Sequence, residues 1–167
     1  MRALLVALVA LFGLSACGYK LGYVKPQAFA NVKAIYVPTF KNETLEPRSS
    51  VLVTNAVIQQ FQRDGTYRIA SANRSDAILE ASILELRRRQ TRSARFNTLR
   101  TSELEFTLIV GYKLRDRRSG EIIDEGKVQG EVASFLEPNF QLSERQALPL
   151  AAERLAENLV SRLSEGW

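Results

Sequence analysis

Apolar residues alternate with other residues along positions 104–114, and this pattern constrains the fold more than any other feature of the chain. The apolar positions are Leu104, Phe106, Leu108, Val110, Tyr112 and Leu114. A period of two is that of a β-strand with one buried face. A sheet built around such a strand needs a covering layer on one side. Glu103 and Glu105 fall on the opposite side, where solvated charges explain them better than acid–base chemistry.

Other segments predict further strands and two helices. Strands are expected over residues 31–40, ending near Pro38, and over 67–70, 76–89 and 121–134, the last weakened by Gly126 and Gly130, which indicate a bulge or an edge. Ser49 and Ser50 are candidate caps of a helix that stops at Gly65. A C-terminal amphipathic helix is expected to begin near Leu148, since Pro149 suits a first turn.

The predicted fold class is therefore α+β. The element order β, α, β, β, β, β, α gives a two-layer α/β sandwich, with a small mixed, mostly antiparallel sheet covered on one face by two amphipathic helices. The first strand, the first helix and the next strand are expected to form a right-handed crossover with parallel pairing. The other face of the sheet is expected to be relatively polar.

The N-terminus has the form of a bacterial lipoprotein signal. Arg2 precedes an apolar run over residues 3–14, which as a helix would be about 18 Å long, too short to span a bilayer. Leu14-Ser15-Ala16 then lead to Cys17, the only cysteine of the chain, as in a lipobox. On this interpretation Cys17 is the lipidated first residue of the mature protein. The alternative is a chance cysteine at the end of an ordinary signal peptide or short membrane anchor.

Composition argues against an enzyme. The chain has no histidine and one cysteine, which rules out imidazole bases, histidine-ligated metals and disulfides. We find no phosphate-binding glycine loop and no G-x-S-x-G motif. The formal net charge of +5 is too small by itself to indicate nucleic-acid binding. We therefore expect no catalytic site, no metal and no cofactor beyond the lipid on Cys17.

Several short motifs, in order, resemble the lipopolysaccharide-assembly lipoproteins of the LptE family. They are the mature start Cys17-Gly18-Tyr19-Lys20-Leu21, VPTFKNETLEP over residues 37–47, Arg63-Asp64-Gly65, and SDAILE over residues 75–80. Ala81 stands where the family pattern suggests glycine. The resemblance implies a signal peptide at 1–16, a lipidated tether at 17–30 and a single periplasmic LptE-like domain at 31–167.

The resemblance also implies a location and partners. Members of the family are anchored in the inner leaflet of the outer membrane and face the periplasm. They plug a lipopolysaccharide-assembly β-barrel protein, help it assemble, aid the transport of lipopolysaccharide to the cell surface, and bind lipopolysaccharide. Gly18 agrees with an outer-membrane destination, since aspartate there would favour the inner membrane.

Arginine clusters suggest where an anionic lipid would bind. The first cluster consists of Arg87, Arg88, Arg89, Arg92, Arg95 and Arg100, and the second of Arg115, Arg117 and Arg118. Guanidinium groups suit phosphate geometry. Consecutive hairpin turns lie at opposite ends of a meander, so the clusters are expected to form separate patches. The first cluster is the candidate lipopolysaccharide site; contact with the barrel wall and simple solvation remain its alternatives.

Two other functions compete with lipopolysaccharide transport. A lipid-anchored periplasmic activator of a cell-wall synthase is the first, although such a protein usually needs a longer tether than residues 17–30. A lipid-anchored hydrolase is the second, and the missing histidine and nucleophile motif argue against it.

Overall fold

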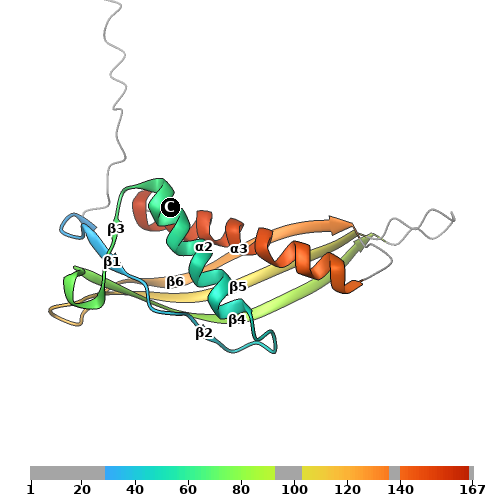
Figure 1. Ribbon diagram of the computed structural model, residues 1–167, viewed down its shortest axis with the longest axis horizontal. Helices are drawn as coiled ribbons and strands as arrows, with labels where there is room; N and C mark the ends of the chain where they lie inside the picture. The colour runs from blue at the N-terminus through green and yellow to red at the C-terminus, as the bar shows by residue number, and fades with distance from the viewer. Residues whose placement is uncertain (1–28, 93–102, 136–139, 166–167) are drawn as a thin grey trace, which may run out of the picture.

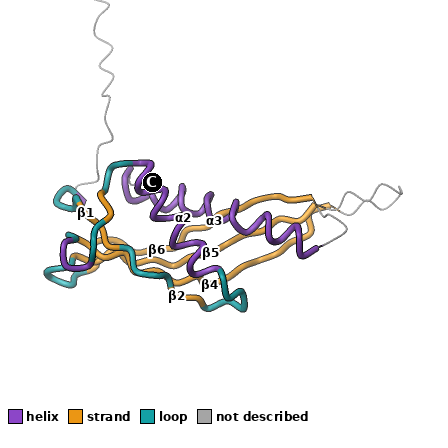
Figure 2. Tube along the Cα trace, in the orientation of Figure 1, coloured by secondary structure: helices purple, strands orange, loops and turns teal. Residues whose placement is uncertain are grey.

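Two helices lie on one face of a six-stranded sheet (Figures 1 and 2). The structure, a computed structural model, describes residues 29–92, 103–135 and 140–165. In chain order its elements are β1 (Ala34–Tyr36), β2 (Lys41–Asn42), α2 (Ser49–Asp64), β3 (Arg68–Ile69), the 3-10 turn η2 (Ala72–Arg74), β4 (Ala77–Arg92), β5 (Glu103–Asp116), β6 (Ile122–Phe135) and α3 (Phe140–Glu165). The α+β prediction is confirmed, with the two-residue β2 as an addition to the expected order.

The sheet is mixed, and its long strands are antiparallel. The strand order is β3-β1-β4-β5-β6, and β2 pairs with β4 beside β1. β1 runs parallel to β3 and β4, whereas β4–β5 and β5–β6 are antiparallel over most of their length. The parallel pairing expected around the first helix is therefore present between β1 and β3.

The alternation along β5 separates a buried face from an open one. Phe106, Leu108, Val110, Tyr112 and Leu114 are all buried beneath the helices. On β4, Leu79, Ala81 and Ile83 continue the buried face, as predicted. The opposite face, which we call the open face, has no helix over it among the described elements (Figure 1).

Helix α2 ends as predicted but begins differently. Gly65 has a left-handed φ of 75° and donates its backbone N–H to the Phe61 carbonyl at 3.0 Å, so it is the expected C-cap. The N-cap is Arg48, without a side-chain cap, and the predicted capping role of Ser49 and Ser50 is wrong. The Ser49 hydroxyl instead donates to the Glu46 carbonyl at 2.7 Å, because the preceding loop already folds back onto the helix entry.

Helix α3 begins at Phe140, so the prediction of a start near Leu148 is wrong. Pro149 lies inside the helix. A proline within a helix costs about 3 kcal/mol because a hydrogen bond is lost and the ring crowds the previous turn. Here the turn before it places Ala147 against Phe106 and Val132, which covers the sheet beyond the main core. This burial explains why the helix continues through the proline.

The two glycines of β6 have another role than a bulge. β6 is an edge strand, as one of the two interpretations predicted, but its register shift lies opposite Leu114 and Arg115 rather than at a glycine. A Cβ on Gly130 would collide with the Ala151 carbonyl oxygen and the Leu155 nitrogen, so glycine allows α3 to rest directly on β6.

The N-terminal end of the described chain belongs to the core. Phe29 and Val32 are buried, and the Val32 N–H donates to the Phe29 carbonyl at 3.0 Å. Residues 1–28, including Cys17, lie outside the described residues. None of the helices in the described ranges is long and apolar enough to cross a membrane.

Candidate functional site

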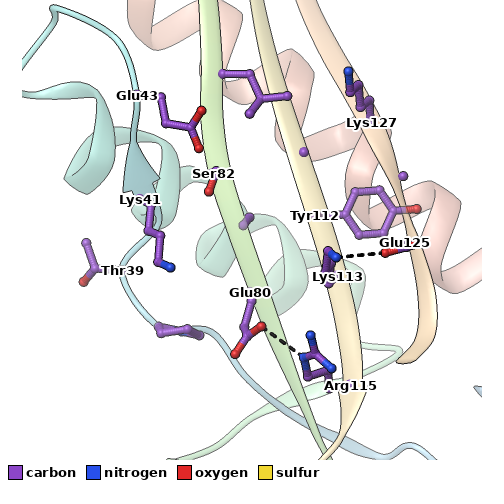
Figure 3. A pocket seen from close by; sticks show the side chains of 15 residues that line it. Thr39, Lys41, Glu43, Glu80, Ser82, Tyr112, Lys113, Arg115, Glu125 and Lys127 are labelled. Carbon is purple, nitrogen blue, oxygen red and sulfur yellow. Dashed lines mark hydrogen bonds and ion pairs between the residues drawn. The ribbon is translucent and has the colours of Figure 1, made fainter. Parts of the chain in front are cut away.

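The open face carries a broad depression of about 880 Å³ (Figure 3). β4, β5 and β6 form its floor, and the segment from Pro38 to Glu43 forms one side. Its lining combines charged side chains with apolar surface.

Leu84 and Gly111 form the apolar centre of this depression. The β4–β5 register shifts between Ile83 and Glu85, and Leu84 occupies this irregularity. A Cβ on Gly111 would lie 3.2 Å from Leu84 Cδ1, so Leu84 lies over Gly111 on the open face. Sequence analysis missed this feature. Its signal was that Leu84 directly follows Ile83, so that two apolar residues are adjacent where a strand of period two would place a polar one.

Charged residues surround the apolar centre, and four of them form ion pairs. Lys113 Nζ lies 3.2 Å from Glu125 Oε2, and Arg115 Nε lies 3.2 Å from Glu80 Oε2 (Figure 3). Both pairs link neighbouring strands. Their exposure to solvent limits each to about 0–1 kcal/mol of stability.

Lys41 and Lys127 are the other cations of the depression. Lys41 is on β2 and Lys127 is on β6, so the two lysines lie on opposite sides of β4 and β5, which carry Leu84 and Gly111. Figure 3 shows the two lysines at opposite sides of the depression. Within the described residues neither ammonium group lies within ion-pair distance of a carboxylate. The site therefore offers two cations for an external anion.

A second depression, of about 510 Å³, continues the first along the open face. It shares Leu84 and Lys127 with the first depression and adds Ile109 and Arg87. The two depressions together form a strip in which apolar side chains lie among five cationic and four acidic ones, with Lys41 and Lys127 as the cations without an ion-pair partner in the described residues. Such a surface suits a molecule that carries both negative charge and hydrocarbon.

The first predicted arginine cluster is divided between the two faces of the sheet. Arg87 and Arg89 are opposite Thr107 and Glu105 on the open face, whereas Arg88 is opposite Phe106 on the helix side. Arg87 Nη2 lies 2.9 Å from Glu85 Oε2, and Arg89 Nε lies 3.6 Å from Glu105 Oε1. Arg92 is the last residue of β4, and the structure describes only its backbone. Arg95 and Arg100 also lie outside the described residues.

The second cluster lies at the other end of the sheet, as the meander predicted. Its turn connects β5 to β6, and Arg117 Nε donates to the Ser75 carbonyl at 2.6 Å. The Asp116 carboxylate accepts the backbone N–H groups of Arg118 and Ser119, which hold its pKa below the usual value. These contacts stabilise the turn and tie it to the start of β4.

Two residues of the motifs that carried the family resemblance, Asn42 and Asp76, make hydrogen bonds that shape the backbone. Asn42 Oδ1 accepts the Thr44 N–H at 3.0 Å and its hydroxyl at 2.8 Å, and Asn42 Nδ2 donates to the Glu46 carbonyl at 2.8 Å. These bonds fold the loop that follows Lys41. Asp76 accepts the backbone N–H groups of Lys33 and Ala34, which lower its pKa.

Two buried tyrosines donate their hydroxyl groups to hydrogen bonds within the protein. Tyr112 donates to Asp124 Oδ2 at 2.7 Å; burial, followed by this hydrogen bond, raises its pKa. Tyr67 donates to the Leu163 carbonyl at 2.6 Å, and burial, with a smaller contribution from Asp64, raises its pKa to about 12. Both phenols therefore stay protonated at neutral pH, and neither is suited to act as a base.

The helix layer carries a separate groove of about 580 Å³. It lies between the start of α2 and the Pro149 turn of α3, and Val51 and Leu52 line it. Val51 and Leu150 are exposed hydrophobic residues, and Leu45 on the nearby loop is fully exposed. Exposed apolar clusters of this kind are typical of contact surfaces.

Over the described residues there is no group of three potential metal ligands.

Solved structures of bacterial proteins share the fold. A subunit of the PelC dodecamer from Paraburkholderia phytofirmans is 18% identical, with a TM-score of 0.55 over 84% of this chain and 95% of that one. A minor lipoprotein from Acinetobacter baumannii is 13% identical, with a TM-score of 0.52 over 80% and 92%. Protein CT253 from Chlamydia trachomatis is 10% identical, with a TM-score of 0.55 over 79% and 95%. These identities establish a shared fold.

Sequence comparison identifies the family. No curated protein sequence matches the chain. The family model described as LptE, lipopolysaccharide-assembly, matches residues 32–163, which include every described element from β1 to most of α3. The resemblance inferred from the short motifs is thereby confirmed, and the chain belongs to the LptE family of lipopolysaccharide-assembly proteins.

Proposed function

We propose that this protein is an outer-membrane lipoprotein that presents lipopolysaccharide to an assembly β-barrel through its open face. The family is one of non-enzymatic lipoproteins in lipopolysaccharide assembly that need no cofactor. The protein is accordingly a membrane-associated lipoprotein of that process. The proposal adds the anchor at Cys17, the inner leaflet of the outer membrane, the barrel partner and the ligand site.

The strip on the open face is the observation that carries the ligand site. Lys41 and Lys127 lie on either side of Leu84 and Gly111, and Arg87 continues the strip. Ammonium and guanidinium groups bind phosphate, while Leu84 and Ile109 offer contact to acyl chains. Of the predicted cluster, Arg87 lines the strip, and Arg89 lies further along the same face of β4.

A binding experiment with purified, full-length protein tests the ligand site. Lys41→Gln combined with Arg87→Gln removes two cations from the strip and is expected to reduce capture on immobilised lipopolysaccharide several-fold. The matched control is Arg63→Gln with Arg154→Gln, which removes two exposed cations from the helix layer. Wild-type binding should also weaken as salt rises, since salt screens exposed charges beyond about 10 Å at 0.1 M.

The control pair decides the interpretation. Equal losses from both pairs would mean that net charge, and not the strip, governs binding. Unchanged binding by the strip variant, with folding confirmed by circular dichroism, would reject the open face as the site. The predicted arginines outside the described residues, Arg95 and Arg100, would then be the next to replace.

Affinity purification tests the proposed partner. Tagged protein extracted from outer membranes is expected to bring down a β-barrel protein whose migration in gels changes on heating. Depletion of the chain should lower the amount of mature barrel. Recovery of a cell-wall synthase instead would support the alternative function, and unchanged barrel assembly would reject the assembly role.

A further inference from the structure

Four exposed cations gather at the end of the sheet where the described chain begins. Here β1, β3 and β4 start, and β5 passes into the turn that leads to β6 (Figure 1). Lys33 precedes β1 and Arg68 begins β3, while Arg74 lies in η2 and Arg118 in the β5–β6 turn. We call these four residues the basic end. The ligand site on the open face uses none of them.

Hydrogen bonds hold the segments of the basic end together. The Arg68 N–H donates to the Lys33 carbonyl at 2.9 Å, and the Asp76 carboxylate accepts the Lys33 N–H at 3.0 Å. The Asp76 carbonyl accepts an N–H of the β5–β6 turn at 2.9 Å. Backbone hydrogen bonds, that of Lys33 first, lower the pKa of Asp76, and the charges of Arg118 and Arg68 lower it further. Both arginines therefore lie close to Asp76.

The carboxylates at this end are mostly bound to backbone N–H groups. Asp64 accepts one such group, and Asp76 and Asp116 accept two each. Glu121, in the β5–β6 turn, is exposed. Within the described residues none of the four cations of the basic end lies within ion-pair distance of a carboxylate. Their side chains are therefore available to an anionic partner.

The chain leads from the basic end to the proposed lipid anchor. Phe29 and Val32, which precede Lys33, are buried, so the domain begins at this end. Phe29 follows Cys17 by twelve residues, which span at most about 43 Å. A membrane held this close by the same chain is an intramolecular partner, and weak contacts with it are effective.

We propose that the basic end docks on the anionic phospholipid headgroups of the leaflet that holds the anchor. The inference rests on the proposed anchor at Cys17, and it concerns the lipoprotein before its barrel partner encloses it. Guanidinium and ammonium groups suit headgroup phosphates, and each cation near an anionic surface strengthens binding about fivefold. The long strands then rise from the membrane, which leaves the open face accessible.

Energy transfer in reconstituted vesicles tests this contact. Full-length lipidated protein with Ser119→Cys carries a donor dye in the β5–β6 turn, and lipid headgroups carry the acceptor. The lipid on Cys17 blocks that thiol, so the dye reacts at one position. Transfer is expected to be about twofold higher in phosphatidylcholine vesicles that contain phosphatidylglycerol than in phosphatidylcholine alone. This excess should disappear at high salt, which screens exposed charges.

A second dye position is the control for orientation. Ala133 is exposed near the end of β6, about 36 Å along the strand from Ile122. Protein with Ala133→Cys should therefore show weaker transfer than protein with Ser119→Cys, and phosphatidylglycerol should not increase it.

Charge variants in the Ser119→Cys background identify the contact. Lys33→Gln combined with Arg68→Gln should remove the excess transfer, because the loss of two cations weakens docking about 25-fold. The matched control is Arg89→Gln with Arg154→Gln, which removes two exposed cations of β4 and α3 and should retain the excess. Circular dichroism should show both variants folded.

Three results would overturn the proposal. They are transfer at Ser119→Cys that does not depend on phosphatidylglycerol, equal transfer from the two dye positions, and equal effects of the two charge variants. Failure of the wild type to float with phosphatidylcholine vesicles would reject the anchor, and this inference with it. The vesicles contain no lipopolysaccharide, so failure of the open-face site would leave all of these results unchanged.

Discussion

The Asp76 carboxylate accepts the backbone N–H of Ala34 at 2.9 Å, which joins the start of β4 to β1 through a side chain. The same Oδ2 atom accepts the N–H of Lys33 at 3.0 Å. The backbone of Asp76 adds two bonds: its N–H donates to the Ala34 carbonyl, and its carbonyl accepts the Arg117 N–H. One residue of the SDAILE motif thus connects β1, β4 and the β5–β6 turn.

Asp76→Asn is therefore expected to destabilise the fold. The amide oxygen can still accept both backbone N–H groups, but it carries no negative charge and therefore accepts them more weakly, so a cost of about 1–2 kcal/mol is expected at neutral pH. Hydrogen bonds from Lys33 and Ala34 lower the pKa of Asp76 below its ordinary value of 3.8. The contribution of the carboxylate is thus complete above that value and is lost as pH falls through the folded-state pKa.

Urea unfolding at several pH values measures this difference. The wild type and Asp76→Asn should differ most at neutral pH and converge in acid. Asp116→Asn is a suitable control, because Asp116 accepts backbone N–H groups only within its own turn. A difference between wild type and Asp76→Asn that persists in strong acid would show that the charge is not its cause.

Gly130→Ala is expected to be among the most damaging single substitutions. The added Cβ would meet the Ala151 carbonyl oxygen and the Leu155 nitrogen, and it would lie 2.8 Å from Leu155 Cβ. Helix backbone cannot move aside as a flexible side chain can, so a loss of about 3 kcal/mol is expected in thermal or denaturant unfolding.

Gly126→Ala tests the reason for that loss. Its added Cβ would lie 3.3 Å from the Tyr112 hydroxyl and 3.4 Å from an Arg162 nitrogen, both at the ends of side chains. The substitution should therefore cost much less. Similar losses at the two glycines would indicate that strand propensity, rather than contact with α3, accounts for both.

Phe106→Ala and Thr107→Ala test the facing of β5. Phe106 packs against Ala147 and Val132, and its truncation should cost about 3–5 kcal/mol. Thr107 is also buried, at 5% exposure, although it lies on the open face, so a smaller loss near 1 kcal/mol is expected. Equal midpoint shifts in a denaturant titration would contradict this assignment.

Cys17→Ser tests the predicted anchor. The wild-type mature N-terminus is expected to carry diacylglycerol and an N-linked acyl chain, visible as added mass on the first tryptic peptide. The serine variant should lack these masses and fail to be processed as a lipoprotein. Each buried methylene contributes about 0.8 kcal/mol, so the lost chains would also release the protein from the membrane. An unmodified Cys17 in membrane-extracted wild type would disprove the anchor.

The sequence predicted what depends on local periodicity. The period of two over residues 104–114 identified the buried face of β5, and the left-handed Gly65 ended α2 as expected. It failed where tertiary contacts outweigh local preference. Pro149 suggested a helix start, but burial of Ala147 extends α3 by eight residues toward the N-terminus of the helix, from the expected Leu148 to Phe140.

The candidate site was predicted in part for the same reason. The density of arginines predicted Arg87 and its neighbours as one site. Side chains alternate between the two faces of a strand, so Arg88 lies on the helix side. Lys41 and Lys127 are far apart in the sequence, and only the pairing of β2 and β6 with the central strands brings them to one depression. No local pattern contains that information.

The close seating of α3 on Gly130 also has a mechanical consequence. Where helix backbone rests on strand backbone, there is no intervening side chain whose rotamers could absorb a displacement. α3 and β6 must then shift together as a stiff beam along one side of the molecule. The register irregularity of β4 at Leu84, between Ile83 and Glu85, interrupts the regular pairing and bends that strand instead.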